Sequence, residues 1–275
     1  MNWDHVNKEL GIEDAGEWLN EDAGWTSTPV SISVPFQPRC SVPSPENAHA
    51  RSYTVGDFHH QKLVSIIKEK ITCLEMSHQF HFEPYELLWH PSHLLEPVRV
   101  QGELYSSPAF IDVHRYLQNS PGEPGCNLPR VVVALMYFSN STHLTTFGNA
   151  KLWPLYQHFG NDSKYPRCKP TSNLCEHVAY FLTVCVFSLT FYHLNMQLPD
   201  SFKDFASTQI GGGQVPTAAF TTHCHRELMH EQWKILLDDK FLEAWKHGIV
   251  LLCPDGISRQ FYLQIFTYSA DYPEK

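Results

Sequence analysis

An unbroken apolar run, Val131–Phe138, constrains the fold of this 275-residue chain more than any other feature. The run holds eight consecutive apolar or aromatic residues and opens with three valines. Alternate side chains of a strand point to opposite faces, so a strand of this composition is buried on both faces. That is the position of a central strand covered by helices. The run therefore predicts an α/β fold, and a chain of this length can bury a core of one or two domains.

Periodic patterns predict further elements around this strand. Apolar residues at helical spacing predict helices at 58–76, at 101–118 and from Thr221 or Thr222 to Gly248. Strand patterns predict a second strand at 151–158 and a hairpin of 249–253 and 260–268 around an Asp255-Gly256 turn. The other stretches are broken by Pro and Gly or are polar, and we expect loops at 80–100, 119–129, 159–174 and 205–219.

Charge and composition divide the chain into three parts. The net charge is −9, and the first 25 residues carry −6 of it through seven acids and one base. We expect residues 1–56 to be an acidic, Ser/Pro-rich tail and linker without fixed structure. Residues 57–129 are expected to be an irregular, partly helical region, and 130–275 the α/β core. No part is basic, which argues against a free-standing nucleic-acid binder.

The stretch 177–199 contains no Asp, Glu, Lys or Arg, and its length would suit a membrane helix. Its β-branched, aromatic and polar residues favour a buried strand or an inserted segment instead. The eight cysteines form no C-x-x-C pair and the chain starts with a polar segment. We therefore expect reduced thiols and a nuclear or cytoplasmic protein.

Polar residues follow the two best strands, at Asn140 and at Asp271. Chemistry in open α/β sheets gathers where strands end, so these two side chains face one another if the strands are neighbours. Two carboxylates there would hold divalent metals for phosphoryl transfer. Asn140 supplies only a neutral carbonyl, so both residues could equally be strand-end caps.

Two other groups of residues have alternative interpretations. His223, Cys224, His225 and His230 are zinc-ligand types, but the same residues suit a helix N-terminus with solvent-facing imidazoles. Asp255 lies in an Asp-Gly turn, which favours that dipeptide for backbone reasons.

Long strings of the sequence resemble the Plavaka transposases of fungal DNA transposons. The resemblance covers roughly residues 56–275 and is carried by FHFEPYELLW, by GELYSSPAFIDVHRYLQNSPGEPGCNLPR, by LPRVVVALMYFSNSTHLTTFGNAKLWPLYQHFGNDSKYPRCKPTS and by THCHRELMHEQWKILLDDKFLEAWKHGIVLLCPDGISRQFYLQIFTYSADYPEK.

The resemblance implies a ribonuclease-H-like core with a carboxylate triad and magnesium, acting on DNA by cleavage and strand transfer. The family pattern has Asp where this chain has Asn140. Asp271 corresponds to the second acid, with Asp255 as the fallback, and the third acid would lie beyond residue 275. The resemblance thus implies a partial core in a truncated, degenerate copy.

A further departure from the family pattern lies at 181–197, FLTVCVFSLTFYHLNMQ, which interrupts the join between Tyr180 and Leu198. A retained intron translated as protein would have this composition. Three functions follow as hypotheses: an inactive transposase remnant, a non-catalytic binding protein that kept part of the fold and could be a homo-oligomer, or a single-span membrane protein. Restoring Asp at position 140 is not expected to restore cleavage.

Overall fold

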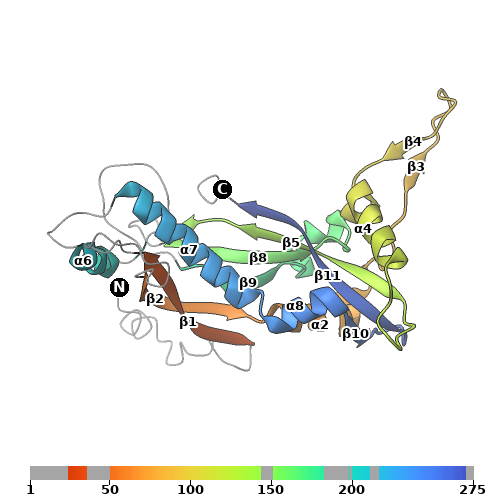
Figure 1. Ribbon diagram of the computed structural model, residues 1–275. Coiled ribbons are helices and arrows are strands. Elements are labelled where there is room, and N and C mark those ends of the chain that lie inside the picture. Colours follow the sequence, from red (N-terminus) through yellow and green to blue (C-terminus); the bar gives the residue numbers. More distant parts are fainter. Residues whose placement is uncertain are drawn as a thin grey trace, which may run out of the picture.

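The computed structural model describes residues 24–35, 50–143, 151–182, 198, 200–210 and 217–270. Within these ranges the chain forms a curved mixed sheet with helices packed on it, which confirms the α/β class (Figure 1). The sheet has seven strands in the order β1-β2-β9-β8-β5-β11-β10. Their bounds are β1 (Trp25–Pro35), β2 (Ala50–Gln61), β9 (Glu176–Tyr180), β8 (Pro154–Phe159), β5 (Arg130–Ser139), β11 (Ser258–Ala270) and β10 (Ile249–Leu252).

Strand β5 is the central strand that the apolar run predicts. It pairs antiparallel with β8 and parallel with β11. Val131, Val133 and Leu135 belong to the main core cluster, and Val132 and Ala134 belong to a second cluster on the other face. All five are at most 2% exposed. Because both faces of β5 are buried, its residues are continuously apolar and do not alternate with polar ones.

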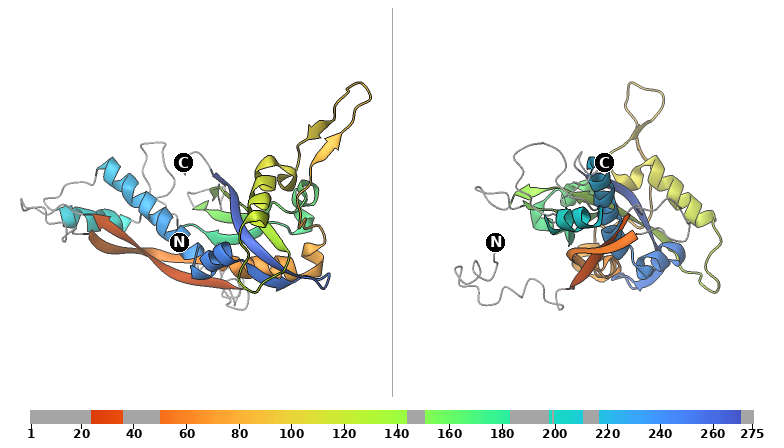
Figure 2. Two further views of the ribbon diagram at one scale, coloured as in Figure 1. Left: turned by 45° about the vertical axis from the view of Figure 1, so that its right-hand side comes forward. Right: turned by 60° about the vertical axis from the view of Figure 1, so that its left-hand side comes forward.

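Helices cover both faces of the sheet (Figure 2). Helix α7 runs along one face and contacts β1 and β2, while α4 contacts β5 on the other face through Phe110. The α-helices are α2 (Leu63–Thr72), α3 (Leu74–Ser77), α4 (Pro108–Asn119), α5 (Lys164–Arg167), α6 (Asp200–Ile210), α7 (Ala218–Leu236) and α8 (Asp239–His247), and the short 3-10 helices are η3 (Leu104–Ser106) and η4 (Pro170–Ser172).

Two small sheets complete the described fold. Strands β6 (Thr142–His143) and β7 (Lys151–Leu152) pair beyond the end of β5. Strands β3 (Leu87–Trp89) and β4 (Val98–Val100) form a hairpin that projects away from the body of the molecule (Figures 1 and 2). Most of the loop expected over 80–100 is irregular, but the expectation missed these two short strands, which pair with each other across the Pro-containing tip.

The N-terminal third contributes to the sheet, which corrects the expected linker over 26–56. In β1 every second residue from Val30 to Val34 is buried, and the intervening serines face outward. A Ser-rich segment with this alternation is a half-buried strand, which the Ser/Pro content concealed. Strand β2 then occupies the start of the helix expected at 58–76, and helix begins only at Leu63. Residues 1–23 and 36–49 lie outside the described residues.

The C-terminal part agrees with the sequence in outline and differs in its breaks. The expected hairpin is confirmed as β10 and β11, with Gly256 at φ 79° in the turn. The long helix ending at Gly248 is two helices, because Asp238 caps the second one through a 2.9 Å bond from the Phe241 amide. The first begins with Thr217 as its cap, four residues before the expected start. Helix α6 extends to Ile210, into the loop expected over 205–219.

The apolar stretch 177–199 divides between fold and undescribed residues. Its first part is β9, and Phe181 is 2% exposed, with its amide donating to the Trp153 carbonyl at 2.9 Å. The Leu182 amide donates to Oε1 of Gln232 at 2.7 Å. Phe181 thus belongs to the core, and Leu182 packs against it. Residues 183–197 lie outside the described part of the chain. Among the described residues, no helix is long and apolar enough to cross a membrane.

Candidate functional site

The carboxyl ends of β5 and β11 lie side by side. Because these strands are parallel, both point their last residues to the same edge of the sheet, and Ala270 is paired with Ser139. A register shift between Ile265 and Thr267 adds one residue to β11 and brings this pairing about. The sheet order thus makes these two strands neighbours, which is the condition that the sequence argument about Asn140 and Asp271 left open.

Helix α7 holds these two strand ends together. Trp233 makes edge-on contacts with Tyr137 of β5 and with Tyr268 of β11, both at 5.4 Å between ring centroids. The hydroxyls of Ser139 and Tyr268 are 2.9 Å apart, and Ser139 is fully buried. The Trp233 indole and the Ser139–Tyr268 hydrogen bond therefore help to hold the ends of β5 and β11 together.

The candidate residues occupy different ends of the sheet. Asn140 follows β5 directly and is half-buried. Asp271 follows Ala270 in the sequence and lies outside the described residues. Asp255 lies in the β10–β11 turn, before β11 begins, so the whole length of β11 separates it from the Asn140 edge.

Asp255 is also engaged locally. Its carboxylate accepts a 3.0 Å bond from the Ile257 amide and pairs with Arg259 at 2.7 Å. The Arg259 guanidinium, and then the Ile257 amide, lower the pKa of Asp255. These contacts are those of a turn-forming residue, and the structure does not bring this fallback acid to Asn140.

Several polar atoms are buried near the Asn140 end on the side of β5 and β8 that faces α7. Tyr137 pairs with Gln157 across these strands. Within the described ranges, the Tyr137 hydroxyl, the Ser141 hydroxyl, the Trp153 indole nitrogen and the Gln157 amide are buried without a hydrogen-bond partner. A buried polar group in that state costs about 1–3 kcal/mol. Several unpaired buried polar groups at one strand end destabilise the fold, which favours a functional role for these residues over a purely structural one.

The second group of possible metal ligands, His223, Cys224, His225 and His230, is spread along α7. Cys224 is buried, and burial, with Glu227 as a smaller contribution, raises the pKa of its thiol to about 11. Burial lowers the pKa of His225, whose Nε2 accepts a 3.4 Å bond from the Leu198 amide. His230 instead lies 3.6 Å from Glu227. Among the described residues no three His, Cys, Asp or Glu side chains converge on one point that could hold a metal.

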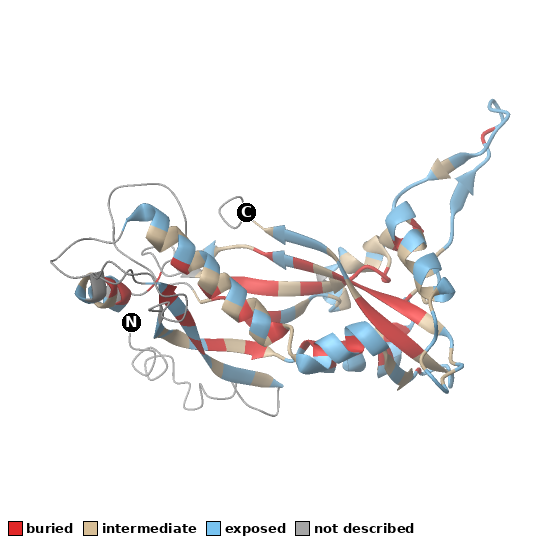
Figure 3. Ribbon diagram, viewed as in Figure 1, coloured by how far each residue is buried: buried red, intermediate tan, exposed pale blue. Residues whose placement is uncertain are grey.

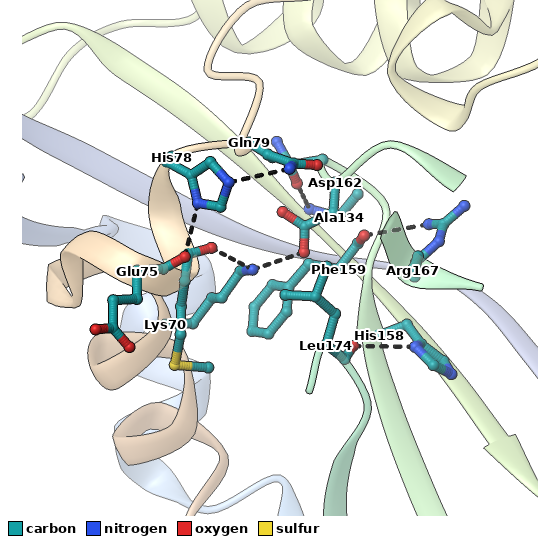
Figure 4. Close-up of polar contacts among 12 residues, drawn as sticks. Lys70, Glu75, His78, Gln79, Ala134, His158, Phe159, Asp162, Arg167 and Leu174 are labelled. Atoms are coloured by element: carbon teal, nitrogen blue, oxygen red, sulfur yellow. Dashed lines mark hydrogen bonds and ion pairs between the residues drawn. The ribbon is translucent and has the colours of Figure 1, made fainter. Parts of the chain in front are cut away.

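A buried ion pair at the opposite end of the sheet was not foreseen from the sequence (Figure 4). Lys70 of α2 and Asp162, after β8, approach to 2.7 Å, and their side chains are 1% and 0% exposed. Lys70 also donates to the Met76 carbonyl at 2.6 Å. Burial raises the pKa of Asp162, and the nearby Lys70 only partly opposes that rise. The pair ties α2 to the β8 end of the sheet.

Asn161, next to Asp162, makes further hydrogen bonds at the same end of the sheet. Its Oδ1 accepts from the Ala134 amide at 2.8 Å, and its Nδ2 donates to the Val132 carbonyl at 2.9 Å, so it binds the backbone of β5. The same amide nitrogen donates to the His81 carbonyl at 2.9 Å. Gly160 precedes it in a tight approach, where an added Cβ would lie 3.0 Å from that of Ala134. Gly160, Asn161 and Asp162 therefore connect β5, α2 and the His81 backbone. The prediction of a polar loop over 159–174 did not include this structural role.

The fold defines the class of this molecule: an α/β protein with a mixed sheet in which the parallel strands β5 and β11 end at the same edge. The chain belongs to the Plavaka transposase family, because the sequence model of the Plavaka transposase matches residues 17–194. The matched range includes β5 and Asn140, and it begins in the N-terminal region where the sequence suggested only a tail. No curated protein matches the chain. No solved structure matches it either.

Proposed function

We propose that this chain is a copy of a transposon-encoded DNA transposase whose metal site lay at the ends of β5 and β11 and has lost its first carboxylate at Asn140. Family membership supports an ancestry in DNA transposition. The observation that carries the location of the site is the parallel pairing of Ala270 with Ser139. In that register the next residues along the two strands are Asn140 and Asp271, the proposed first and second positions of the site.

The strand order supports a ribonuclease-H-like core. Strands β5, β8 and β9 follow one another and pair antiparallel, and β11 then returns beside β5 in parallel. The connection from β9 to the β10–β11 hairpin contains α6, α7 and α8. A mixed sheet of this order with packed helices supports the partial ribonuclease-H-like core that the resemblance implies. We also propose that residues 181–197 are an insertion in that connection.

The residues at this edge do not fit a magnesium site as they stand. Magnesium prefers charged oxygen ligands in octahedral geometry, and Asn140 presents a neutral amide. The loss of one carboxylate from a two-metal site removes several kcal/mol of transition-state stabilisation. We therefore propose that the chain is inactive.

Metal binding by an Asn140→Asp variant tests the location of the site. The new carboxylate would lie next to Ser139, beside the end of β11, and should join Asp271 in binding a divalent cation. We expect affinity for Mn²⁺, measured by titration calorimetry or electron paramagnetic resonance, to rise at least tenfold over the unmodified chain. Cleavage activity is not expected to return with it.

Two controls make this result specific. Adding Asp271→Asn to the variant should abolish the gain, whereas adding Asp255→Asn should leave it intact, since Asp255 lies at the other end of β11. An unchanged Mn²⁺ affinity in Asn140→Asp, or a gain that survives Asp271→Asn, would show that the site is not at these two positions.

A further inference from the structure

A stripe of polar side chains lies on the face of the sheet where Trp233 of α7 contacts Tyr137. Tyr137, Trp153 and Gln157 are at most 1% exposed, and β5 and β8 both carry long buried stretches (Figure 3). Within the described ranges, the groups without a hydrogen-bond partner include the hydroxyls of Tyr137 and Ser141, the indole nitrogen of Trp153 and both amide atoms of Gln157. Buried polar groups almost always have a partner, so these four side chains, the polar stripe, point to a bound molecule.

The strand register arranges the polar stripe as two facing pairs. Tyr137 of β5 lies directly opposite Gln157 of β8. The pairing of β6 with β7 continues the register of β5 with β8, which places Ser141 opposite Trp153. Opposite residues of an antiparallel pair point to the same face, with their Cβ atoms about 4.5–5.5 Å apart. Each unpaired polar group therefore faces another one without bonding to it directly.

The two pairs are separate sites. Ser139 and Leu155 lie opposite each other between them. The hydroxyls of Ser139 and Tyr268 are 2.9 Å apart. Tyr137 and Ser141 are four residues apart, which corresponds to about 13 Å along a strand. A single small molecule therefore cannot contact both pairs.

The chemistry of the polar stripe selects its ligand. Burial raises the pKa of Tyr137, so its hydroxyl stays protonated and can both donate and accept a hydrogen bond. The Gln157 amide likewise offers donors and an acceptor, and none of the four side chains carries a charge. The ligand must therefore be small, neutral, and both a donor and an acceptor. A buried water makes about three hydrogen bonds, and polar groups that face one another without a direct bond are commonly bridged by water.

We propose that one internal water molecule is bound between Tyr137 and Gln157 and a second between Ser141 and Trp153. The first water has three polar atoms within the pair, which are the Tyr137 hydroxyl and the two amide atoms of Gln157. Bound water offsets the cost of burying these groups, so α7 packs on a hydrated face of the hairpin. The proposal does not depend on the metal site, since neither Asn140 nor Asp271 belongs to the polar stripe.

X-ray radiolysis of the full chain, read by mass spectrometry, tests both water sites. Irradiation converts water into hydroxyl radicals, which oxidise the aromatic side chains that they reach. Tyr137 and Trp153 are 1% exposed, so their oxidation reports bound water and not bulk solvent. After correction for intrinsic reactivity, both should be oxidised several-fold faster than Phe58, which is 0% exposed and has no polar side-chain atom. Rates no higher than that of Phe58 would overturn the proposal.

A Gln157→Leu variant separates the two sites. It removes two of the three partners of the first water, so oxidation of Tyr137 should fall several-fold while Trp153 keeps its rate. Gln232→Leu is the matched control, because Gln232 is also 0% exposed but both of its amide atoms already bond to the protein backbone. An unchanged Tyr137 rate in Gln157→Leu, or an equal fall in Gln232→Leu, would contradict the first site. Circular dichroism checks that both variants fold, and if either does not, the comparison within the unmodified chain decides alone.

Discussion

Replacing Lys70 by Met is expected to lower the free energy of unfolding by about 3–5 kcal/mol at pH 7. The Lys70 ammonium is the ion-pair partner of Asp162 at 2.7 Å, and both side chains are buried. Removing it leaves a carboxylate without a counter-charge in a site that water does not reach. Urea denaturation followed by circular dichroism would measure the loss.

The pH dependence of this loss follows from the direction of the Asp162 shift. Its folded-state pKa is raised above the ordinary value of 3.8, so its contribution to stability is fully present below that value and is lost as pH rises through the folded pKa. Without Lys70 the pKa should rise further. The destabilisation of Lys70→Met should therefore shrink as pH falls from 7 toward about 4.

Two further variants isolate the charge effect. Lys70→Met combined with Asp162→Leu removes both charges and should be more stable at pH 7 than Lys70→Met alone. Arg115→Met breaks the exposed pair of Arg115 and Asp112, which lie 2.9 Å apart, and should change stability little. If Lys70→Met and Arg115→Met lowered the free energy of unfolding equally, or if the effect of Lys70→Met did not vary with pH, this account of the Lys70–Asp162 ion pair would be contradicted.

Replacing Trp233 by Ala is expected to lower the free energy of unfolding by about 2–3 kcal/mol, less than the ~3–5 kcal/mol of a fully buried aromatic side chain, because Trp233 is half-buried and packs against the core. The indole contacts Tyr137, Tyr268 and Phe181, so its removal frees β5, β11 and the end of β9 from α7 at once. Tyr165→Ala on α5 is the control, because that ring is 71% exposed. A Trp233→Ala variant as stable as this control in thermal unfolding would mean that α7 does not hold the strand ends.

The central strand and the β10–β11 hairpin could be predicted from the sequence for simple reasons. Val131–Phe138 is apolar on both faces, and Asp255-Gly256 supplies the turn with a glycine at positive φ. Strand β1 was missed because its buried residues alternate with serines, which together with Pro suggested a linker. The break in the long helix was missed because the apolar stripe continues across it, and only the Asp238 cap marks the new start.

The candidate site was foreseen in part. That Asn140 and Asp271 follow neighbouring strands depends on which strands pair, and the parallel pairing of β5 with β11 now supports it. The Lys70–Asp162 pair could not be predicted, since 92 positions separate the two residues and nothing local marks either as buried. The burial of polar atoms of Tyr137, Ser141, Trp153 and Gln157 could not be predicted for a similar reason. Many other polar residues lie between these positions in the sequence, and only the pairing of β5 with β8 places Tyr137 opposite Gln157.

A DNA nicking assay on the unmodified chain tests the central claim most directly. Purified chain would be incubated with supercoiled plasmid and Mg²⁺ or Mn²⁺, with a metal-chelated sample as the control. Because Asn140 removes a charged ligand from the proposed metal site, we expect no nicking above the chelated control. Metal-dependent nicking by the unmodified chain that disappears in Asp271→Asn would contradict the account, since it would show a working site despite Asn140.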